Sequence, residues 1–404
     1  MNKEKINNSQ VFALVADYTI GTTVLSIISG VAGYAGRDAW IVALVTPFMG
    51  LPILWMYFYL NKLFPGKTLV EIIQDVFGKW VGWILSAYFV FFVCFLSVSE
   101  VVFYMGNFVK SEYMTETPLY AFNTFLVIAI AVGLLYGIET IGRSSEIFLY
   151  IISFLILLTI LLDLPNIKTD NLFPVLENGI GPVLKGCLYL NSFLALPLIV
   201  FAFFYPLNVT DVQKSRKSFL GGYFWASFLS FLCTIMSIFI LGATITAKTN
   251  YPTYLFSKEI NISSITRFEG FITFSWMFAE FIKVSIYSYA GLVGFTQLFG
   301  LKGYKKMVIP IGISILVFSG VVYPDIAYQQ KWDSTTWVVS VGTIGFVLPA
   351  ALIIGKKIKD VIHHVKAMET KEKAFYDDLK SLLYLCLAAI IIILSIFLIR
   401  FLLV

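Results

Sequence analysis

Residues 186–206 read GCLYLNSFLALPLIVFAFFYP, a stretch in which no side chain is charged. A bilayer core is about 30 Å thick and an α-helix rises 1.5 Å per residue, so about 20 apolar residues span it. Inside lipid the backbone must satisfy its own hydrogen bonds, which leaves only helices or a closed barrel. The stretch is continuously apolar rather than alternating, so it predicts a membrane-spanning helix.

Ten further stretches have the same character, and the eleven together occupy most of the 404-residue chain. Hydrophobic residues make up 59 % of the chain and charged residues 13 %, whereas a soluble protein carries about a quarter charged residues. The composition therefore predicts an all-α integral membrane protein. The expected spans are residues 11–33, 41–61, 80–108, 118–137, 143–163, 186–206, 219–246, 268–298, 306–324, 335–355 and 381–403.

Lysine and arginine indicate the orientation of the chain, because cytoplasmic loops are enriched in both. With the N-terminus inside, the inner segments carry 18 of these residues and the outer segments carry 8. We therefore expect a cytoplasmic N-terminus. The longest hydrophilic stretch, residues 356–380, is expected to be a basic cytoplasmic connector that lies on anionic lipid headgroups.

The sequence contains no motif typical of catalysis, nucleotide binding or nucleic-acid binding. His363 and His364 lie in the basic stretch 356–380 and are expected to belong to the connector, so we do not expect a metal site there. The four cysteines lie inside or at the edges of apolar spans, and they are expected to pack as small apolar residues. We expect neither an enzyme activity nor a cofactor.

Two spans contain residues that weaken a helix near the middle of the membrane. The first span contains Gly21-Thr22-Thr23, and the sixth contains Asn191-Ser192 followed by Pro197. These spans open two successive sets of five, and interruptions at corresponding positions of two halves indicate a transporter-type binding site. The alternative is that glycine and proline only adjust helix packing, as they commonly do in membranes.

Charged residues inside spans are informative because polar groups are costly in lipid. Asp17 lies one turn before Gly21, Glu100 lies in the third span, and Glu280 and Lys283 share one face of the eighth. Two interpretations stay open. Either these groups line a cavity, with Lys283 where a cation would otherwise bind, or Glu280 and Lys283 neutralise each other without a ligand.

Short motifs over residues 5–355 occur in an order and spacing that identify a family. They are Ile20-Gly21, Asp38-Ala39-Trp40-Ile41, Phe77-Gly78-Lys79-Trp80-Val81-Gly82, Asn171-Leu172-Phe173-Pro174-Val175-Leu176, Arg267-Phe268-Glu269 and Tyr323-Pro324-Asp325. Through them the chain resembles the endospore germination permeases, the B subunits of spore germinant receptors, in the amino acid–polyamine–organocation transporter superfamily.

The resemblance implies a ten-helix core of two five-helix inverted repeats, with helices one and six broken. The core would cover residues 1–355, followed by the connector 356–380 and an additional eleventh helix at 381–404. The resemblance also implies a membrane A subunit and a lipoprotein C subunit as partners, in the spore inner membrane. The implied pocket for a small-molecule germinant falls on Gly21, Thr22, Thr23, Ser97, Glu100, Leu196, Pro197, Ile282 and Lys283.

The chain departs from the family pattern after Pro197. Many relatives carry Gly-Glu shortly after this proline, whereas here Ile199 and Val200 follow. The missing carboxylate and the buried Lys283 favour a sensor of an amino acid or another small germinant. A secondary amino acid transporter coupled to protons or Na⁺ is the alternative, and a passive scaffold for the A subunit is the third hypothesis.

Overall fold

The computed structural model describes residues 4–260 and 267–368, and these form a bundle of helices. Seven helical stretches of the described residues are each long and apolar enough to cross a membrane. They are Ile27–Leu63, Lys79–Glu112, Leu119–Tyr136, Ile138–Asn166, Ile180–Phe203, Val212–Lys248 and Thr336–Val361. The fold class predicted from the sequence, an all-α integral membrane protein, is confirmed.

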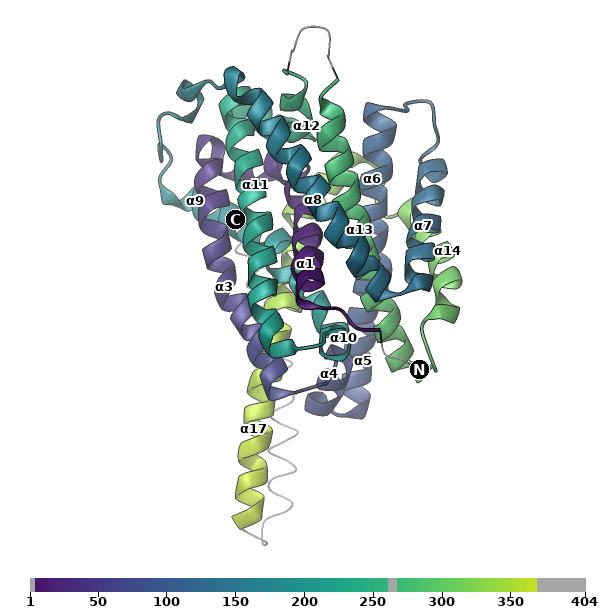
Figure 1. Ribbon diagram of the computed structural model, residues 1–404. Helices are drawn as coiled ribbons and strands as arrows, with labels where there is room; N and C mark the ends of the chain where they lie inside the picture. The colour runs from purple at the N-terminus through teal and green to yellow at the C-terminus, as the bar shows by residue number, and fades with distance from the viewer. Residues whose placement is uncertain (1–3, 261–266, 369–404) are drawn as a thin grey trace.

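The first half of the bundle runs from a central helix to the helices that surround it. In Figure 1, α1 lies in the middle with α11, α8 and α13 around it. Helix one consists of α1 and α2, and helix three consists of α5, a π-helical turn η2, and α6. The elements are α1 Asn8–Thr23, α2 Ile27–Ala35, η1 Gly36–Asp38, α3 Ala39–Leu63, α4 Leu69–Phe77, α5 Lys79–Phe91, η2 Phe92–Ser97, α6 Val98–Glu112, α7 Leu119–Tyr136 and α8 Ile138–Asp163.

The second half repeats this plan, with a broken helix followed by four spans. Helix six consists of α9, η5 and α10, and helix ten consists of α16, a second π-helical turn η7, and α17. The elements are η3 Leu164–Asn166, η4 Thr169–Leu172, α9 Ile180–Leu194, η5 Leu196–Phe203, α10 Tyr205–Asn208, α11 Val212–Lys248, α12 Pro252–Ser257, α13 Glu269–Leu298, η6 Lys305–Met307, α14 Val308–Ser319, α15 Ile326–Ser334, α16 Thr336–Gly342, η7 Thr343–Val347 and α17 Leu348–Met368.

Ten of the eleven predicted spans lie in the described residues, and each contains helix. The eleventh, 381–403, lies outside them. A separate helix, α15, precedes the tenth span and fills most of the segment between the ninth and tenth predicted spans, which matters for the site. At its other end, α17 continues as one helix through position 355 to Met368.

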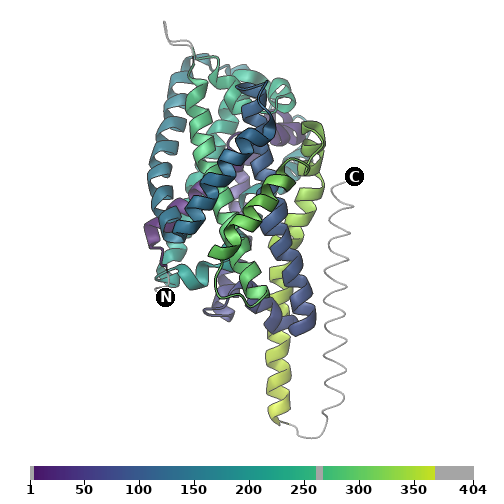
Figure 2. The same ribbon diagram turned by 90° about the vertical axis from the view of Figure 1, so that its right-hand side faces the viewer.

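The start of α1 and the helix α17 lie at the same end of the bundle, which we call the lower end, and α12 lies at the opposite, upper end (Figures 1 and 2). At the lower end the segment before α1 pairs with the link between α10 and α11. The Ile6 N–H donates to Asn208 O over 2.8 Å, and the Thr210 N–H donates to Ile6 O over 3.1 Å. Glu4 accepts from the Ile138 N–H over 2.9 Å and lies 3.6 Å from the ammonium of Lys305. These contacts tie the lower half of helix one to three neighbouring elements.

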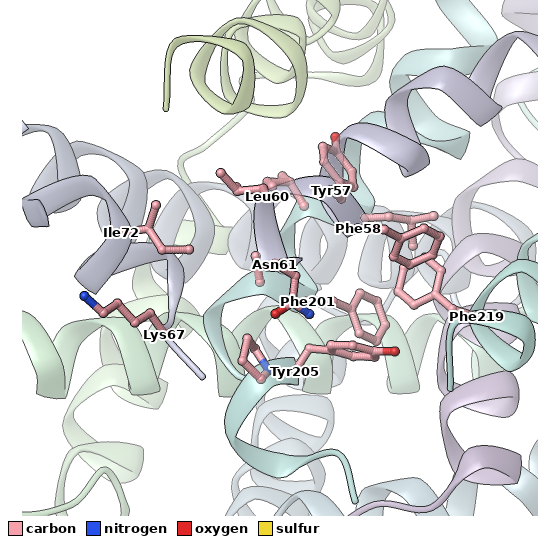
Figure 3. A pocket seen from close by; sticks show the side chains of 13 residues that line it. Tyr57, Phe58, Leu60, Asn61, Lys67, Ile72, Phe201, Tyr205 and Phe219 are labelled. Carbon is pink, nitrogen blue, oxygen red and sulfur yellow. The ribbon is translucent and has the colours of Figure 1, made fainter. Parts of the chain in front are cut away.

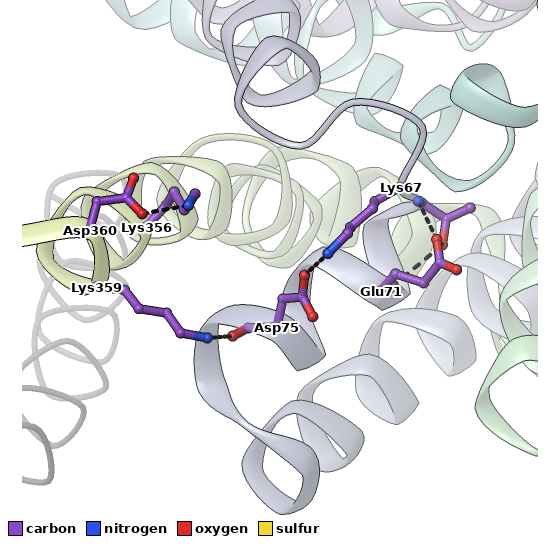
Figure 4. A network of polar contacts seen from close by, with 7 residues as sticks. Lys67, Glu71, Asp75, Lys356, Lys359 and Asp360 are labelled. Atoms are coloured by element: carbon purple, nitrogen blue, oxygen red, sulfur yellow. Dashed lines mark hydrogen bonds and ion pairs between the residues drawn. The ribbon is translucent and has the colours of Figure 1, made fainter. Parts of the chain in front are cut away.

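The projecting helix α17 is fastened to α4, an amphipathic helix at the lower end (Figure 4). The Lys359 ammonium donates to the Asp75 carbonyl oxygen over 2.8 Å, and the Asp75 carboxylate pairs with Lys67. Thr68 and Glu71 form a capping box that fixes where α4 begins. Helix ten and α4 are therefore joined at the lower end of the bundle.

Candidate ligand pocket at the helix breaks

Helix one is broken between Thr23 and Ile27, as the Gly-Thr-Thr motif predicted. Carbonyl oxygens freed by the break receive hydrogen bonds from other helices. The Ser230 hydroxyl donates to Thr23 O over 3.2 Å, and the Thr253 hydroxyl donates to Val24 O over 2.5 Å. An unpaired buried carbonyl costs free energy, so these hydroxyls stabilise the unwound turn.

Helix six is broken after Leu194, where α9 gives way to a 3₁₀ helix with Pro197 in its first turn. Proline cannot donate a helical hydrogen bond, which explains the change at this position. The Tyr57 hydroxyl donates to Leu196 O over 3.0 Å, and the Tyr18 hydroxyl donates to Pro197 O over 3.1 Å. The predicted interruptions of helices one and six are both present.

A central cavity lies beside the break in helix one, and it brings together residues from five different helices. Thr22, Ser97, Glu100 and Lys283, all expected at a pocket, line it. All four are at most 3 % exposed. Its volume of about 20 Å³ has room for one water molecule. Its remaining lining residues are Val101, Tyr104, Phe193, Tyr287 and Trp337.

The side chains from helix three follow the spacing of one helical face. Ser97, Glu100, Val101 and Tyr104 stand at i, i+3, i+4 and i+7, so all four face the cavity. Ser97 ends the π-helical turn η2, and such turns are frequent at functional sites. Among the described residues, neither the Ser97 hydroxyl nor Glu100 Oε1 has a hydrogen-bond partner. Unpaired buried polar atoms at a cavity are where a ligand or water is expected.

Lys283 lies between the two breaks, beyond ion-pair distance of Glu280 but close enough for the two buried charges to interact. Its ammonium donates to the Thr22 hydroxyl and lies 5.0 Å from the centre of the Tyr18 ring. Both carboxylate oxygens of Glu280 lack a hydrogen-bond partner among the residues that the structure describes. Both side chains pack against helix one at Gly21, where a Cβ would lie only 3.1 Å from Glu280 Oε2 and 3.3 Å from Lys283 Cδ. Gly21 therefore permits close approach without lining the cavity.

The other predicted site residues lie near the cavity but do not line it. The Thr23 hydroxyl donates to Thr19 O within α1, and Ile282 is fully buried. Leu196 and Pro197 contribute the carbonyl oxygens already described. Asp17 lies fully buried and accepts a 2.6 Å hydrogen bond from Ser145, which joins α1 to α8.

Aromatic residues cover the cavity, and sequence reasoning missed most of them. Trp337 stacks between Phe92 and Phe193, at ring-centre distances of 5.9 Å and 5.6 Å, and its indole N–H donates to Ser192 O. Above this layer the Tyr104 hydroxyl donates to the buried carboxylate of Asp333 on α15. The spacing of Tyr104 from Ser97 and Glu100 was the one signal that could have identified it.

A second cavity lies below the break in helix six, between α3, α4, η5, α10 and α11 (Figure 3). Its walls are mostly apolar and aromatic, with Phe58, Phe201 and Phe219 in close contact. Lys67 and Asn61 lie along it, and no carboxylate lines it. It offers space beside η5 but no set of groups for a polar ligand. In the described part of the chain, no group of three His, Cys, Asp or Glu side chains could hold a metal ion.

The fold and the central cavity define the class of the protein: it has the fold of secondary transporters built from two five-helix inverted repeats. It is similar to MhsT, solved in complex with L-phenylalanine, with a TM-score of 0.66, 15 % identity and 100 % of each chain covered. It is also similar to Mhp1, a nucleobase-cation-symport-1 family transporter solved in a closed conformation, with a TM-score of 0.59 and 12 % identity over 87 % of this chain and 78 % of that one. At these identities the similarity shows the fold alone.

Within that class the chain belongs to the spore germination protein family, whose model matches residues 5–324. It is 25 % identical over 324 residues to spore germination protein KB of Bacillus subtilis, covering 79 % of this chain and 85 % of that protein. It is 26 % identical over 337 residues to spore germination protein A2 of the same organism, covering 80 % and 88 %. Spore germination protein GerQB of Bacillus cereus is 23 % identical, covering 85 % and 92 %. The family consists of permease-like membrane proteins rather than enzymes, which confirms the prediction that this chain is not an enzyme.

Proposed function

We propose that this chain is the subunit of a spore germinant receptor that binds a small-molecule germinant inside the membrane and signals to partner subunits. The observation that carries the proposal is the central cavity at the broken helix. There Thr22, Ser97, Glu100 and Lys283 converge from three different helices. Buried polar groups of both charge signs around one cavity have no use in a passive scaffold, and they suit recognition of a polar molecule.

The chemistry of the cavity favours an amino acid as the germinant. Lys283 and the Thr22 hydroxyl suit a carboxylate, and the positive end of α2 starts nearby at Ile27. Glu100, which lines the same cavity from helix three, has an oxygen without a partner among the described residues and suits an ammonium group. The two charged ends of a zwitterion would therefore each meet an opposite charge.

The size of the cavity supports signalling by a change of state. With room for about one water, it cannot take an amino acid unless the surrounding helices shift. A ligand shifts a two-state equilibrium only if it binds the two states with different affinities. A tenfold change in the population ratio requires a difference in binding free energy of about 1.4 kcal/mol. Germinant binding would thus stabilise a more open arrangement, which the partner subunits would detect.

The partners and the location belong to the same proposal. We infer a membrane A subunit and a lipoprotein C subunit as partners, in the spore inner membrane, since the related proteins are named spore germination proteins. The excess of lysine and arginine in the inner segments supports a cytoplasmic N-terminus. Residues 1–355 would form the ligand-binding core, 356–380 the basic connector and 381–404 an additional transmembrane helix.

The test compares two matched substitutions in α1. Thr22→Val removes the hydroxyl that accepts from Lys283, whereas Thr19→Val removes a hydroxyl that donates only to Val15 O outside the cavity. Spores carrying Thr22→Val should require at least tenfold more germinant, and spores carrying Thr19→Val should respond like wild type. Equal responses of both variants, at equal protein levels, would contradict a germinant site in the cavity.

An active secondary amino acid transporter, coupled to protons or Na⁺, is the second candidate, and the transporter fold favours it. Concentrative uptake of a labelled amino acid by this chain alone in proteoliposomes would establish transport. We expect binding without uptake, because helix six lacks the carboxylate that relatives carry after the proline.

A further inference from the structure

A third cavity lies above the central one and opens at the upper end of the bundle. It lies between α2, α9, the link from α11 to α12, and α15, and its volume is about 340 Å³. This volume falls in the range of small-molecule pockets, whereas the central cavity holds about one water. We call it the outer vestibule. Its rim residues Gly33 and Gln330 are exposed, and its floor residues Tyr189, Gln329 and Asp333 are buried.

The floor of the outer vestibule presents hydrogen-bond acceptors. Asp333 and Gln329 are each 6 % exposed, and Gln329 Oε1 has no hydrogen-bond partner among the described residues. Asp333 Oδ1 accepts from the Tyr104 hydroxyl. Of the residues that line the vestibule, none is a lysine, arginine or histidine. A buried carboxylate without a cation is costly, so this floor favours a ligand that brings a positive charge and donates hydrogen bonds.

We propose that the outer vestibule is a binding site of its own, which takes a molecule bearing a protonated primary amine with its ammonium between Asp333 and Gln329. The site goes beyond the central pocket, because its two acceptors lie on α15, whereas the polar groups of the central pocket lie on helices one, three and eight. Tyr104 links the two sites, since its side chain lines the central cavity and its hydroxyl donates a hydrogen bond to the Asp333 carboxylate. An ammonium in the vestibule would therefore share this carboxylate with Tyr104, and the Tyr104 hydrogen bond lowers the negative charge that the ammonium meets.

The experiment uses the full chain in nanodiscs and two probes that differ in one group, 4-amino-1-butanol and 1,4-butanediol. Binding is measured by isothermal titration and by thermal stabilisation. The wild type should bind the amine at least tenfold more tightly than the diol, and Asp333→Asn should abolish this preference. Asp325→Asn is the matched control, because Asp325 caps α15 outside the vestibule and asparagine caps equally well. Tyr104→Phe should raise the affinity for the amine, an effect of opposite sign that loss of folding cannot mimic.

The outcomes separate the vestibule from the central pocket. A preference for the amine that survives Asp333→Asn, or no preference in the wild type, would overturn the vestibule site. If Thr22→Val abolishes the preference and Asp333→Asn does not, the amine binds only in the central cavity and the proposed function stands alone. If Asp333→Asn abolishes the preference while Thr22→Val spores germinate normally, the vestibule site stands and the central-pocket proposal fails.

Discussion

At the scale of single residues, the buried ammonium of Lys283 offsets the negative charge of the buried Glu280 carboxylate. It is 3 % exposed, and the neighbouring Glu280 is 1 % exposed with no hydrogen bond to either carboxylate oxygen. Lys283→Met should lower the free energy of unfolding by about 3–5 kcal/mol, because it leaves a buried carboxylate without a nearby cation. Thermal unfolding of the purified protein measures the loss.

The double variant Lys283→Met with Glu280→Gln provides the control. It removes both charges, so it should recover at least half of the lost stability. Under the proposed function it should not recover the germinant response, since Lys283 also donates to Thr22 at the cavity. Full recovery of both stability and response would show that the lysine only neutralises Glu280.

At the scale of elements, Tyr57 connects two irregular segments of different helices. Its hydroxyl lies 3.0 Å from Leu196 O in η5 and 2.6 Å from Gly345 O in the π-helical turn η7. Tyr57→Phe should reduce the free energy of unfolding by about 1–3 kcal/mol, because it removes the single hydroxyl proton that these two buried carbonyl oxygens share. Tyr59→Phe, two residues along α3 on an exposed ring, should change it by less than about 0.5 kcal/mol. Chemical denaturation of both variants checks the difference, and equal stabilities would exclude this role for Tyr57.

The spans and both helix breaks could be predicted from the sequence because their causes are local. Apolar runs of sufficient length give spans, and Gly21 and Pro197 weaken a helix wherever they stand. The π-helical turns have no comparable signal, because a backbone shift from i→i+4 to i→i+5 requires no particular residue type.

The composition of the site could be predicted only in part because its contacts are between distant segments. Thr22 and Lys283 were both identified as intramembrane polar residues, but their hydrogen bond joins positions 261 apart in the chain. Asp333 was missed because it precedes the apolar run of helix ten and lies outside every predicted span. It is buried only because α15 folds back over the vestibule, which is a property of the tertiary structure.

At the scale of the whole molecule, Glu4 joins three separate segments at the lower end. It accepts from the N–H at the start of α8 and pairs with Lys305 after α13, while its own carbonyl accepts from Asn208. Glu4→Ala should release the segment before α1, so amide hydrogen exchange at Ile6 and Thr210 should accelerate at least tenfold. Glu139→Ala removes a carboxylate that pairs only with exposed Arg143, and it should leave this exchange unchanged. Unaltered protection in Glu4→Ala would show that other contacts hold the segment before α1 in place.

The length of α17 would amplify a small rotation at its start into a larger displacement at its far end. The helix has 21 residues and starts directly after the π-helical turn η7, so it is a rod of about 30 Å whose pivot lies next to Leu196 and the broken helix six. A rotation of about 10° at that pivot would move its far end by about 5 Å. This distance is about the rise of one helical turn. Because Lys359 couples the rod to α4, both would travel together. A small rotation next to the ligand pocket would thus move the far end of α17 far enough to change its contacts with another protein.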